Sequence, residues 1–182
     1  MEQDKKVVYS DGDIESVILN AMDDPIEFER LCDEPGAAFH NFTKCRENLI
    51  NWYPFKKNST VLEIGAGMGA LTGCLCEKCG EVVAIEESSR RAAIILKRHK
   101  NYSNLKVISD NIYEHKFNMK FDYVLLIGVL EYVGINNAEG NPYVGLLNKI
   151  RSLLKDDGVL LVAIENKYGL KYWCGAAEDH TG

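Results

Sequence analysis

Glycines recur at every second position in one short segment of the chain. Residues 61–69 read Val-Leu-Glu-Ile-Gly-Ala-Gly-Met-Gly, so an apolar stretch passes through an acidic residue into three glycines. Glycine adopts backbone angles that other residues resist, and it lets the backbone come close to a ligand. A strand that ends in such a loop and continues into a helix presents free N–H groups to a bound molecule. The segment therefore predicts a cofactor site.

Acidic residues follow two later apolar stretches. Glu86 lies seventeen residues beyond Gly69, and Asp110 follows a stretch that contains Val and Ile. A carboxylate at Glu86 can accept two charge-assisted hydrogen bonds from a ribose diol. Asp110 and Asn111 could read the exocyclic amine of an adenine, with Ile112 against its ring. These residues favour a ligand that contains a nucleoside.

Glu63 discriminates between two kinds of nucleoside cofactor. Its carboxylate comes just before the glycines, where it would repel a pyrophosphate but suit a ligand with an ammonium and a sulfonium. The spacing Gly65-x-Gly67-x-x-Ala70 also fits a dinucleotide fingerprint. NAD or FAD is therefore an alternative, as is a purely structural turn, but Glu63 favours S-adenosylmethionine.

From Thr60 onward, apolar stretches alternate with helical patterns. Strands are predicted over 60–64, 81–86, 105–109, 121–127 and 158–164, and helices over 69–79, 88–100 and 142–155. The strands mostly lack polar alternation, as is typical of a parallel sheet covered on both faces. The order predicts an α/β fold with a doubly wound, mainly parallel sheet and helices on both faces. The acidic residues and the glycines would then meet beyond the carboxyl ends of the strands.

The first part of the chain has a different character. Residues 1–58 are polar and helical in pattern, which predicts a helical N-terminal cap before a core over residues 59–182. Three cap helices are expected: one after Asp13 with Ile14, Val17, Ile18 and Met22 on one face, one from Pro25 to about Cys32, and one from Thr43 to about Pro54.

These segments resemble the motifs of class I, seven-strand S-adenosylmethionine-dependent methyltransferases. Residues 63–69 resemble their E/D-x-G-x-G-x-G loop, Glu86 their acidic ribose ligand, and residues 121–131 their fourth-strand motif. The resemblance implies in-line methyl transfer from S-adenosylmethionine. The cofactor contacts that it implies are Glu63, Gly65, Ala66, Gly67, Gly69, Glu86, Glu87, Asp110, Asn111, Ile112 and Gly128.

Catalytic residues are less well defined, because methyl transfer depends largely on positioning and a general base is optional. Glu131 follows the fourth predicted strand, and Glu165 and Asn166 follow the fifth, where an acceptor would approach. His40 could cover the cofactor, and His180 lies near the end of the chain. Ordinary capping, packing or solvation is at least as good an interpretation of each of these residues.

The tail carries a second resemblance. Residues 163–173 and 178–182 are similar to a stretch of bacterial methyltransferases that are often joined to glycosyltransferase modules, and those proteins continue further. The expectation is that residues 1–182 lack the family's last strands and part of its acceptor side, so that cofactor binding survives and turnover is weak. A small-molecule or glycan-precursor acceptor is expected, with a possible glycosyltransferase module in the full-length protein. A catalytically silent cofactor-binding module is an alternative.

Composition sets broader limits. A length of 182 residues suits one domain, and a net charge of −6 argues against a general nucleic-acid binder. No apolar run approaches the roughly 20 residues that span a bilayer, and the charged N-terminus lacks a signal core, so a cytoplasmic location is expected. Cys76 and Cys79 form one C-x2-C pair without a second, which favours core packing over a metal site.

Overall fold

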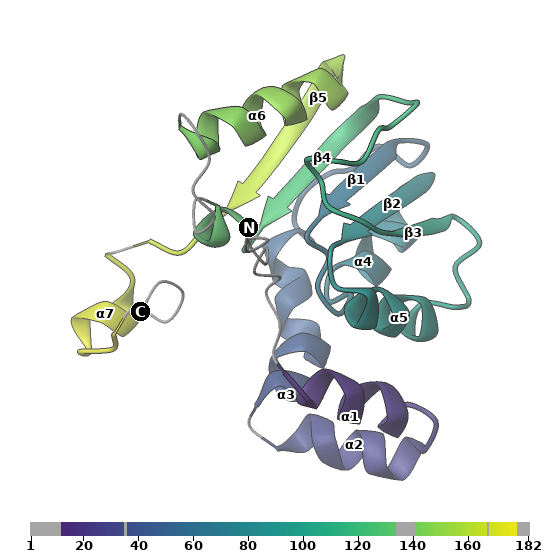
Figure 1. Ribbon diagram of the computed structural model, residues 1–182, viewed down its shortest axis with the longest axis vertical. Coiled ribbons are helices and arrows are strands. Elements are labelled where there is room, and N and C mark those ends of the chain that lie inside the picture. The colour runs from purple at the N-terminus through teal and green to yellow at the C-terminus, as the bar shows by residue number, and fades with distance from the viewer. Residues whose placement is uncertain (1–11, 35, 134–140, 167, 178–182) are drawn as a thin grey trace, which may run out of the picture.

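A five-stranded parallel sheet forms the centre of the computed structural model, which describes residues 12–34, 36–133, 141–166 and 168–177 (Figure 1). The strand order is β3-β2-β1-β4-β5, and each neighbouring pair is parallel. The strands are β1 (Thr60–Ile64), β2 (Glu81–Glu86), β3 (Leu105–Ser109), β4 (Phe121–Ile127) and β5 (Leu154–Ala163). This arrangement confirms the predicted α/β class and all five predicted strands.

Helices cover both faces of the sheet. On one face, α4 (Thr72–Lys78) places Leu75 in a cluster with Val61 of β1, and α5 (Ser89–Arg98) places Ile95 against Ala84 of β2. On the other face, α6 (Pro142–Leu153) places Ile150 in a cluster with Leu62 of β1. Neighbouring residues of one strand are therefore buried on opposite faces, which explains why the central strands are mainly apolar and lack regular polar alternation.

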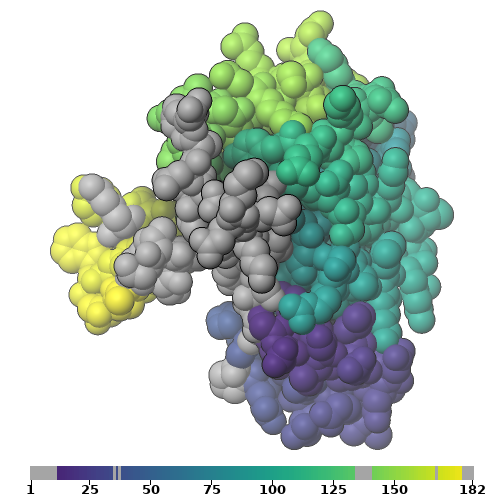
Figure 2. All heavy atoms as spheres, viewed as in Figure 1, coloured from purple at the N-terminus to yellow at the C-terminus, as the bar shows by residue number. Residues whose placement is uncertain are grey.

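Short helices precede the sheet. They are α1 (Ile14–Ala21), α2 (Pro25–Asp33), α3 (Ala37–Phe42) and the 3₁₀ helix η1 (Lys44–Leu49). Helix α1 packs against α5, and Figure 2 shows the purple α1 directly against teal atoms of the sheet-forming part. The apolar face predicted for α1 is wrong at Val17, which is 45% exposed, whereas Glu15 is fully buried. A domain boundary at residue 58 stays a prediction.

Several element bounds differ from the prediction. Helix α4 begins at Thr72 and not at Gly69, because Gly69 has a φ of +77° that an α-helix cannot contain. Strand β5 takes over the end of the helix predicted over 142–155. Thr43 does accept the N–H of Cys45, but the turn that it caps is 3₁₀ and ends at Leu49.

Three short helices escaped prediction: α3, η2 (Leu130–Tyr132) and α7 (Leu170–Trp173). Each is too short to show a helical period. Figure 1 shows α7 standing away from the sheet. Among the residues that the structure describes, no helix combines the length and apolar character needed to cross a membrane.

The clustered cysteines lie in the core. Cys74, Cys76 and Cys79 are buried free thiols that pack with residues of β1, β2 and β4. Burial raises the pKa of the Cys76 thiol to about 12, so it stays protonated and packs as a small apolar side chain.

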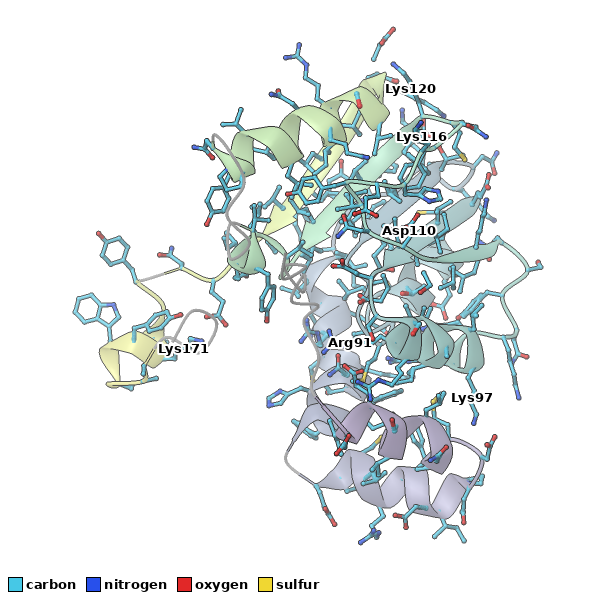
Figure 3. The ribbon with its side chains drawn as sticks, in the orientation of Figure 1. Arg91, Lys97, Asp110, Lys116, Lys120 and Lys171 are labelled. Atoms are coloured by element: carbon cyan, nitrogen blue, oxygen red, sulfur yellow. The ribbon has the colours of Figure 1, made fainter. Side chains whose placement is uncertain are left out.

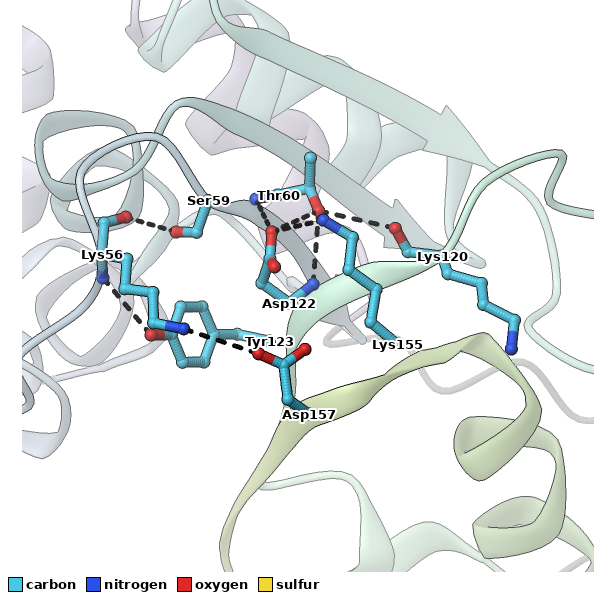
Figure 4. Close-up of polar contacts among 8 residues, drawn as sticks. All are labelled: Lys56, Ser59, Thr60, Lys120, Asp122, Tyr123, Lys155 and Asp157. Atoms are coloured by element: carbon cyan, nitrogen blue, oxygen red, sulfur yellow. Dashed lines mark hydrogen bonds and ion pairs between the residues drawn. The ribbon is translucent and has the colours of Figure 1, made fainter.

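A polar network fastens the strands together at the ends opposite the glycine loop (Figure 4). Asp122 of β4 accepts hydrogen bonds from the Thr60 N–H at 2.8 Å, from the Thr60 hydroxyl at 2.9 Å and from the Lys155 ammonium at 2.8 Å. Burial alone would raise the pKa of Asp122, but the bonds from Lys155 and Thr60 outweigh burial and hold it at about 2. The charged carboxylate therefore stabilises the fold.

We expect Asp122→Asn to lower the free energy of unfolding by about 1.5–3 kcal/mol at pH 7, because charge-assisted hydrogen bonds are lost. The folded pKa lies below the unfolded value of about 3.9, so this stabilisation is present above about pH 4 and fades as the pH falls toward 2. Urea unfolding at pH 7 and at about pH 3 measures both effects.

Asp157→Asn is the matched control for this prediction. Asp157 is 78% exposed and lies 3.7 Å from the Lys56 ammonium, so its loss should change stability by less than about 1 kcal/mol. Equal losses in the two variants would contradict the role given to Asp122.

Candidate cofactor-binding site

The order of strands reverses beside β1. The chain runs outward from β1 through β2 to β3, then returns to place β4 on the other side of β1. In open α/β sheets, ligands bind beyond the carboxyl ends of the strands at such a switch point. Here β1 leads into the glycine loop, residues 65–69, and the neighbouring β4 leads into Gly128. The topology thus brings the residues singled out in the sequence to one edge.

The glycine loop depends on backbone angles that favour glycine. Gly65, Gly67 and Gly69 have φ values of +65°, +57° and +77°. The Gly65 N–H donates to the Ile85 carbonyl at 2.9 Å, which fastens the loop to β2. A Cβ at Gly65 would lie 2.7 Å from a methyl of Val129, whereas no atom of the described residues lies within 4 Å of one at Gly67. The described part of the chain therefore leaves the Gly67 backbone open to a ligand.

Glu86 joins the end of β2 to the glycine loop. It is 7% exposed, and its two oxygens accept the N–H of Gly67 at 2.8 Å and that of Ser88 at 2.9 Å. Burial raises the pKa of Glu86, although these two N–H groups and Arg91 oppose the shift. A carboxylate offers about four lone-pair positions, so about two are left for hydroxyl donors.

Glu63 is also buried, at 5% exposed. The Thr72 hydroxyl donates to its Oε2 at 2.6 Å, which ties the end of β1 to the start of α4. Burial raises the pKa of Glu63 to about 7, against the opposing effects of the Thr72 bond and of Arg98. Because this pKa lies near neutral, a positively charged ligand bound nearby would favour the charged form of the Glu63 carboxylate.

A second group of candidate residues follows the next two strands: Glu87 comes after β2, and Asp110, Asn111 and Ile112 come after β3. The Asn111 amide donates to Glu87 Oε1 at 2.7 Å. Asp110 pairs with His115 at 2.8 Å and accepts the N–H of Asn111, and these two bonds hold the pKa of Asp110 below its usual value. Ile112 is partly buried against the core. The loops in which an adenine was expected are thus linked to each other.

The catalytic candidates Glu131 and Glu165 lie together. The Glu165 N–H donates to Glu131 Oε1 at 3.3 Å. Glu131 Oε2 is buried and accepts no hydrogen bond within the described part of the chain. By contrast, Glu165 Oε2 is engaged by the Tyr172 hydroxyl and the Lys171 ammonium, and Asn166 accepts the N–H of Tyr168. Glu131 therefore has a buried oxygen whose hydrogen-bonding capacity the described residues leave unused.

The other candidates lie elsewhere. His40 is exposed on α3, with its ring against Phe39, and His180 falls outside the described residues. Gly128 has a φ of +64°, and its N–H donates to the Ala163 carbonyl, which joins the ends of β4 and β5.

Sequence reasoning missed two residues that hold the glycine loop. Arg98 donates to the Met68 carbonyl at 3.1 Å, and the His99 ring contacts the Gly69 carbonyl at 2.8 Å. A signal was available, because the two residues follow the buried Ile94 and Ile95 by four positions. Residues at i and i+4 share one face of a helix, so both side chains should point inward.

Solved structures with the same fold include two N-methyltransferases. Coclaurine N-methyltransferase bound to N-methylheliamine and SAH matches with a TM-score of 0.59 and 21% identity, over 85% of this chain and 52% of that chain. NodS from Bradyrhizobium japonicum WM9 in complex with S-adenosyl-l-homocysteine matches with a TM-score of 0.59 and 20% identity, over 75% and 70%. At these identities the similarity establishes the fold.

Among the curated relatives, one matches a short stretch of this chain at higher identity, and another matches a longer stretch at lower identity. The rRNA adenine N-6-methyltransferase of Bacillus licheniformis is 38% identical over 73 residues, which is 40% of this chain and 25% of the relative. The ubiquinone biosynthesis O-methyltransferase of Pelagibacter ubique (strain HTCC1062) is 27% identical over an alignment of 161 residues that covers 78% of this chain and 63% of the relative. The chain thus spans about a quarter of the first relative's length and less than two thirds of the second's.

A family model described as a methyltransferase domain matches residues 62–160, which run from β1 into β5 and make up more than half of the chain. The matched stretch contains the glycine loop, Glu86 and the switch point between β1 and β4. The chain therefore belongs to the family of methyltransferase domains.

Proposed function

We propose that this chain binds S-adenosylmethionine at the carboxyl edge of its sheet and transfers the methyl group to an acceptor. One observation carries the proposal: Glu86, buried at the end of β2, holds the N–H of Gly67 in the glycine loop. This contact supports the proposal, because it holds a carboxylate suited to a ribose diol beside a loop that a ligand can approach closely. Membership of the methyltransferase domain family supports the same conclusion.

The proposed roles of the site residues follow from their positions. Residues 65–69 would approach the amino-acid part of the cofactor, and Glu63 would complement its positive charge. Glu86 would bind the ribose, and the linked loops after β2 and β3 would contact the adenine. The second group would contribute Glu87, Asp110, Asn111 and Ile112 to the cofactor contacts, and Gly128 after β4 would add its backbone. A pyrophosphate beside Glu63 would be repelled, so NAD and FAD fit less well.

S-adenosylmethionine supplies a methyl carbon that the acceptor attacks in line, as the carbon–sulfur bond breaks and its electron pair returns to sulfur. The chain's main contribution would be to orient the two partners, which can supply much of the barrier reduction. We propose Glu131 as the group that takes the acceptor's proton, because its Oε2 is buried and unpartnered in the described part of the chain.

The acceptor is proposed to be a small molecule or a glycan precursor. Several carboxylates lie at the carboxyl edge of the sheet, and the whole chain has a net charge of −6. Both features would repel the phosphates of RNA. An RNA acceptor is the second candidate, since the relative from Bacillus licheniformis is named as an rRNA methyltransferase. A glycosyltransferase module in a longer protein stays a prediction from the tail.

We expect S-adenosylhomocysteine to stabilise the chain against heat, because a ligand at a hundred times its dissociation constant adds about 2.7 kcal/mol of stability. Thermal melts with S-adenosylhomocysteine, NAD and FAD at equal concentration measure this effect. A shift with NAD or FAD and none with S-adenosylhomocysteine at millimolar concentration would overturn the proposal.

An assay with a labelled methyl group then distinguishes an active methyltransferase from a catalytically silent cofactor-binding module. Transfer of label from S-adenosylmethionine to an amine, a sugar or an RNA in an acceptor panel identifies the acceptor class. Tight cofactor binding without transfer to any acceptor would favour the silent module instead.

A further inference from the structure

One residue of the glycine loop belongs equally to the core formed by the N-terminal helices. Met68 lies between Gly67 and Gly69, yet its side chain is only 1% exposed. It packs in one cluster with Ile18 of α1, Ala38 of α3 and Ile94 of α5. The glycine loop therefore cannot change its conformation at Met68 without disturbing the packing of these helices.

Arg98, the last residue of α5, makes a second connection between the same two parts. One guanidinium nitrogen donates to the Met68 carbonyl at 3.1 Å and to the Asn41 carbonyl at 2.9 Å, near the end of α3. The guanidinium also lies 4.4 Å from the ring centre of Phe42, which packs edge-on against Phe28 of α2 at 4.9 Å. Loop and helices thus share one partly buried cation.

His99 fixes the next residue of the loop. Burial lowers the pKa of His99, so the ring is neutral, and the carbonyl of Gly69 at 2.8 Å requires the proton on Nε2. A Cβ at Gly69 would lie 2.9 Å from this nitrogen. Two consecutive carbonyls of the loop are therefore held by two consecutive residues at the end of α5.

The N-terminal helices in turn depend on α5 for their position. Glu15 of α1, fully buried, bonds to the Arg91 guanidinium at 2.7 Å, and Lys97 donates to the Leu19 carbonyl at 2.9 Å. Figure 3 shows Arg91 and Lys97 between the sheet-forming part and these helices. Helix α5 is thus the common support of α1 and of the glycine loop.

We propose that helices α1–α3 set the shape of the glycine loop, with Met68 and Arg98 as the positioning residues, so that docking of these helices and cofactor affinity are coupled. The proposal rests on the proposed function, because it concerns the affinity of that same site. Coupling of two equilibria is reciprocal: docked helices strengthen cofactor binding, and bound cofactor strengthens docking.

A pair of matched variants tests the coupling. Ile18 and Ile150 are both fully buried isoleucines, but Ile18 packs against Met68, whereas Ile150 lies in α6 on the other face of the sheet. We expect Ile18→Ala to weaken binding of S-adenosylhomocysteine at least about five-fold, while Ile150→Ala leaves it unchanged. Calorimetry measures affinity, and urea unfolding verifies that both variants lose comparable stability. Ile18→Val is the milder substitute should Ile18→Ala not fold.

Hydrogen exchange of the unaltered chain supplies the reciprocal measurement. Saturating S-adenosylhomocysteine should slow exchange in α1–α3 as well as in the loop, while α6 stays unchanged. Binding by the unaltered chain, with equal affinities in the two alanine variants and no change of exchange in α1–α3, would overturn the coupling alone. Absence of binding by the unaltered chain would instead refute the proposed function.

Discussion

Replacing Gly67 by valine should abolish binding of S-adenosylhomocysteine, with affinity falling more than about a hundred-fold. The φ of Gly67 is +57°, a region that costs an ordinary L-residue about 1–2 kcal/mol and a β-branched residue more. The new side chain would also project over the loop, where no described residue lies within 4 Å and where the ligand is proposed to lie. Relief of the backbone strain would move the N–H that Glu86 holds. Calorimetry measures the loss, and circular dichroism verifies the fold.

Gly175→Val separates strain from loss of the site. Gly175 also has a positive φ, +87°, and no atom of the described residues within 4 Å of its missing Cβ, but it follows α7 and lies outside the proposed cofactor contacts. This variant should bind S-adenosylhomocysteine as the unaltered chain does. Full affinity in Gly67→Val as well would show that no ligand approaches the loop.

The sheet and its functional edge could be predicted from local sequence. Buried parallel strands need Val, Ile and Leu on both faces, so β1, β2 and β4 show as mainly apolar runs without regular polar alternation. Their order, once recognised as alternating strand and helix, brings the carboxyl ends together without any knowledge of side-chain contacts. Glycine and acidic residues at those ends were therefore enough to locate the candidate site.

The partners of buried polar residues could not be predicted in this way. Glu15 reads as surface because hydrophobic periodicity cannot distinguish a solvated carboxylate from one buried against Arg91. For the same reason, the periodicity predicts that Val17 is buried, whereas its side chain is exposed. The bond between Glu63 and Thr72 likewise depends on where α4 begins, which the angle of Gly69 decides. Such contacts follow from the fold and not from the local pattern.

Burial of Glu86 has opposite consequences for stability and for binding. Its raised pKa means that the folded state disfavours the charged form, so this contribution to stability diminishes as the pH rises through the unfolded and then the folded pKa. A neutral isostere should therefore relieve this cost near neutral pH, but the amide nitrogen of a glutamine would face one of the two N–H groups that the carboxylate accepts and would leave it without an acceptor. A carboxylate that is buried at a cost to folding stability is typical of a functional site.

Glu86→Gln should accordingly weaken binding of S-adenosylhomocysteine about ten- to over a hundred-fold, while the free energy of unfolding at pH 7 falls by no more than about 1–3 kcal/mol, the cost of one N–H group left without an acceptor. Loss of charge-assisted bonds to a ribose costs about 1.5–3 kcal/mol, and each 1.4 kcal/mol is about ten-fold in affinity. Glu81→Gln is the control, because Glu81 begins the same strand at its opposite end and is exposed. Calorimetry and urea unfolding on both variants give the two quantities separately. Unchanged affinity in Glu86→Gln would place the ribose elsewhere, and equal losses of affinity in both variants would point to a general effect of charge.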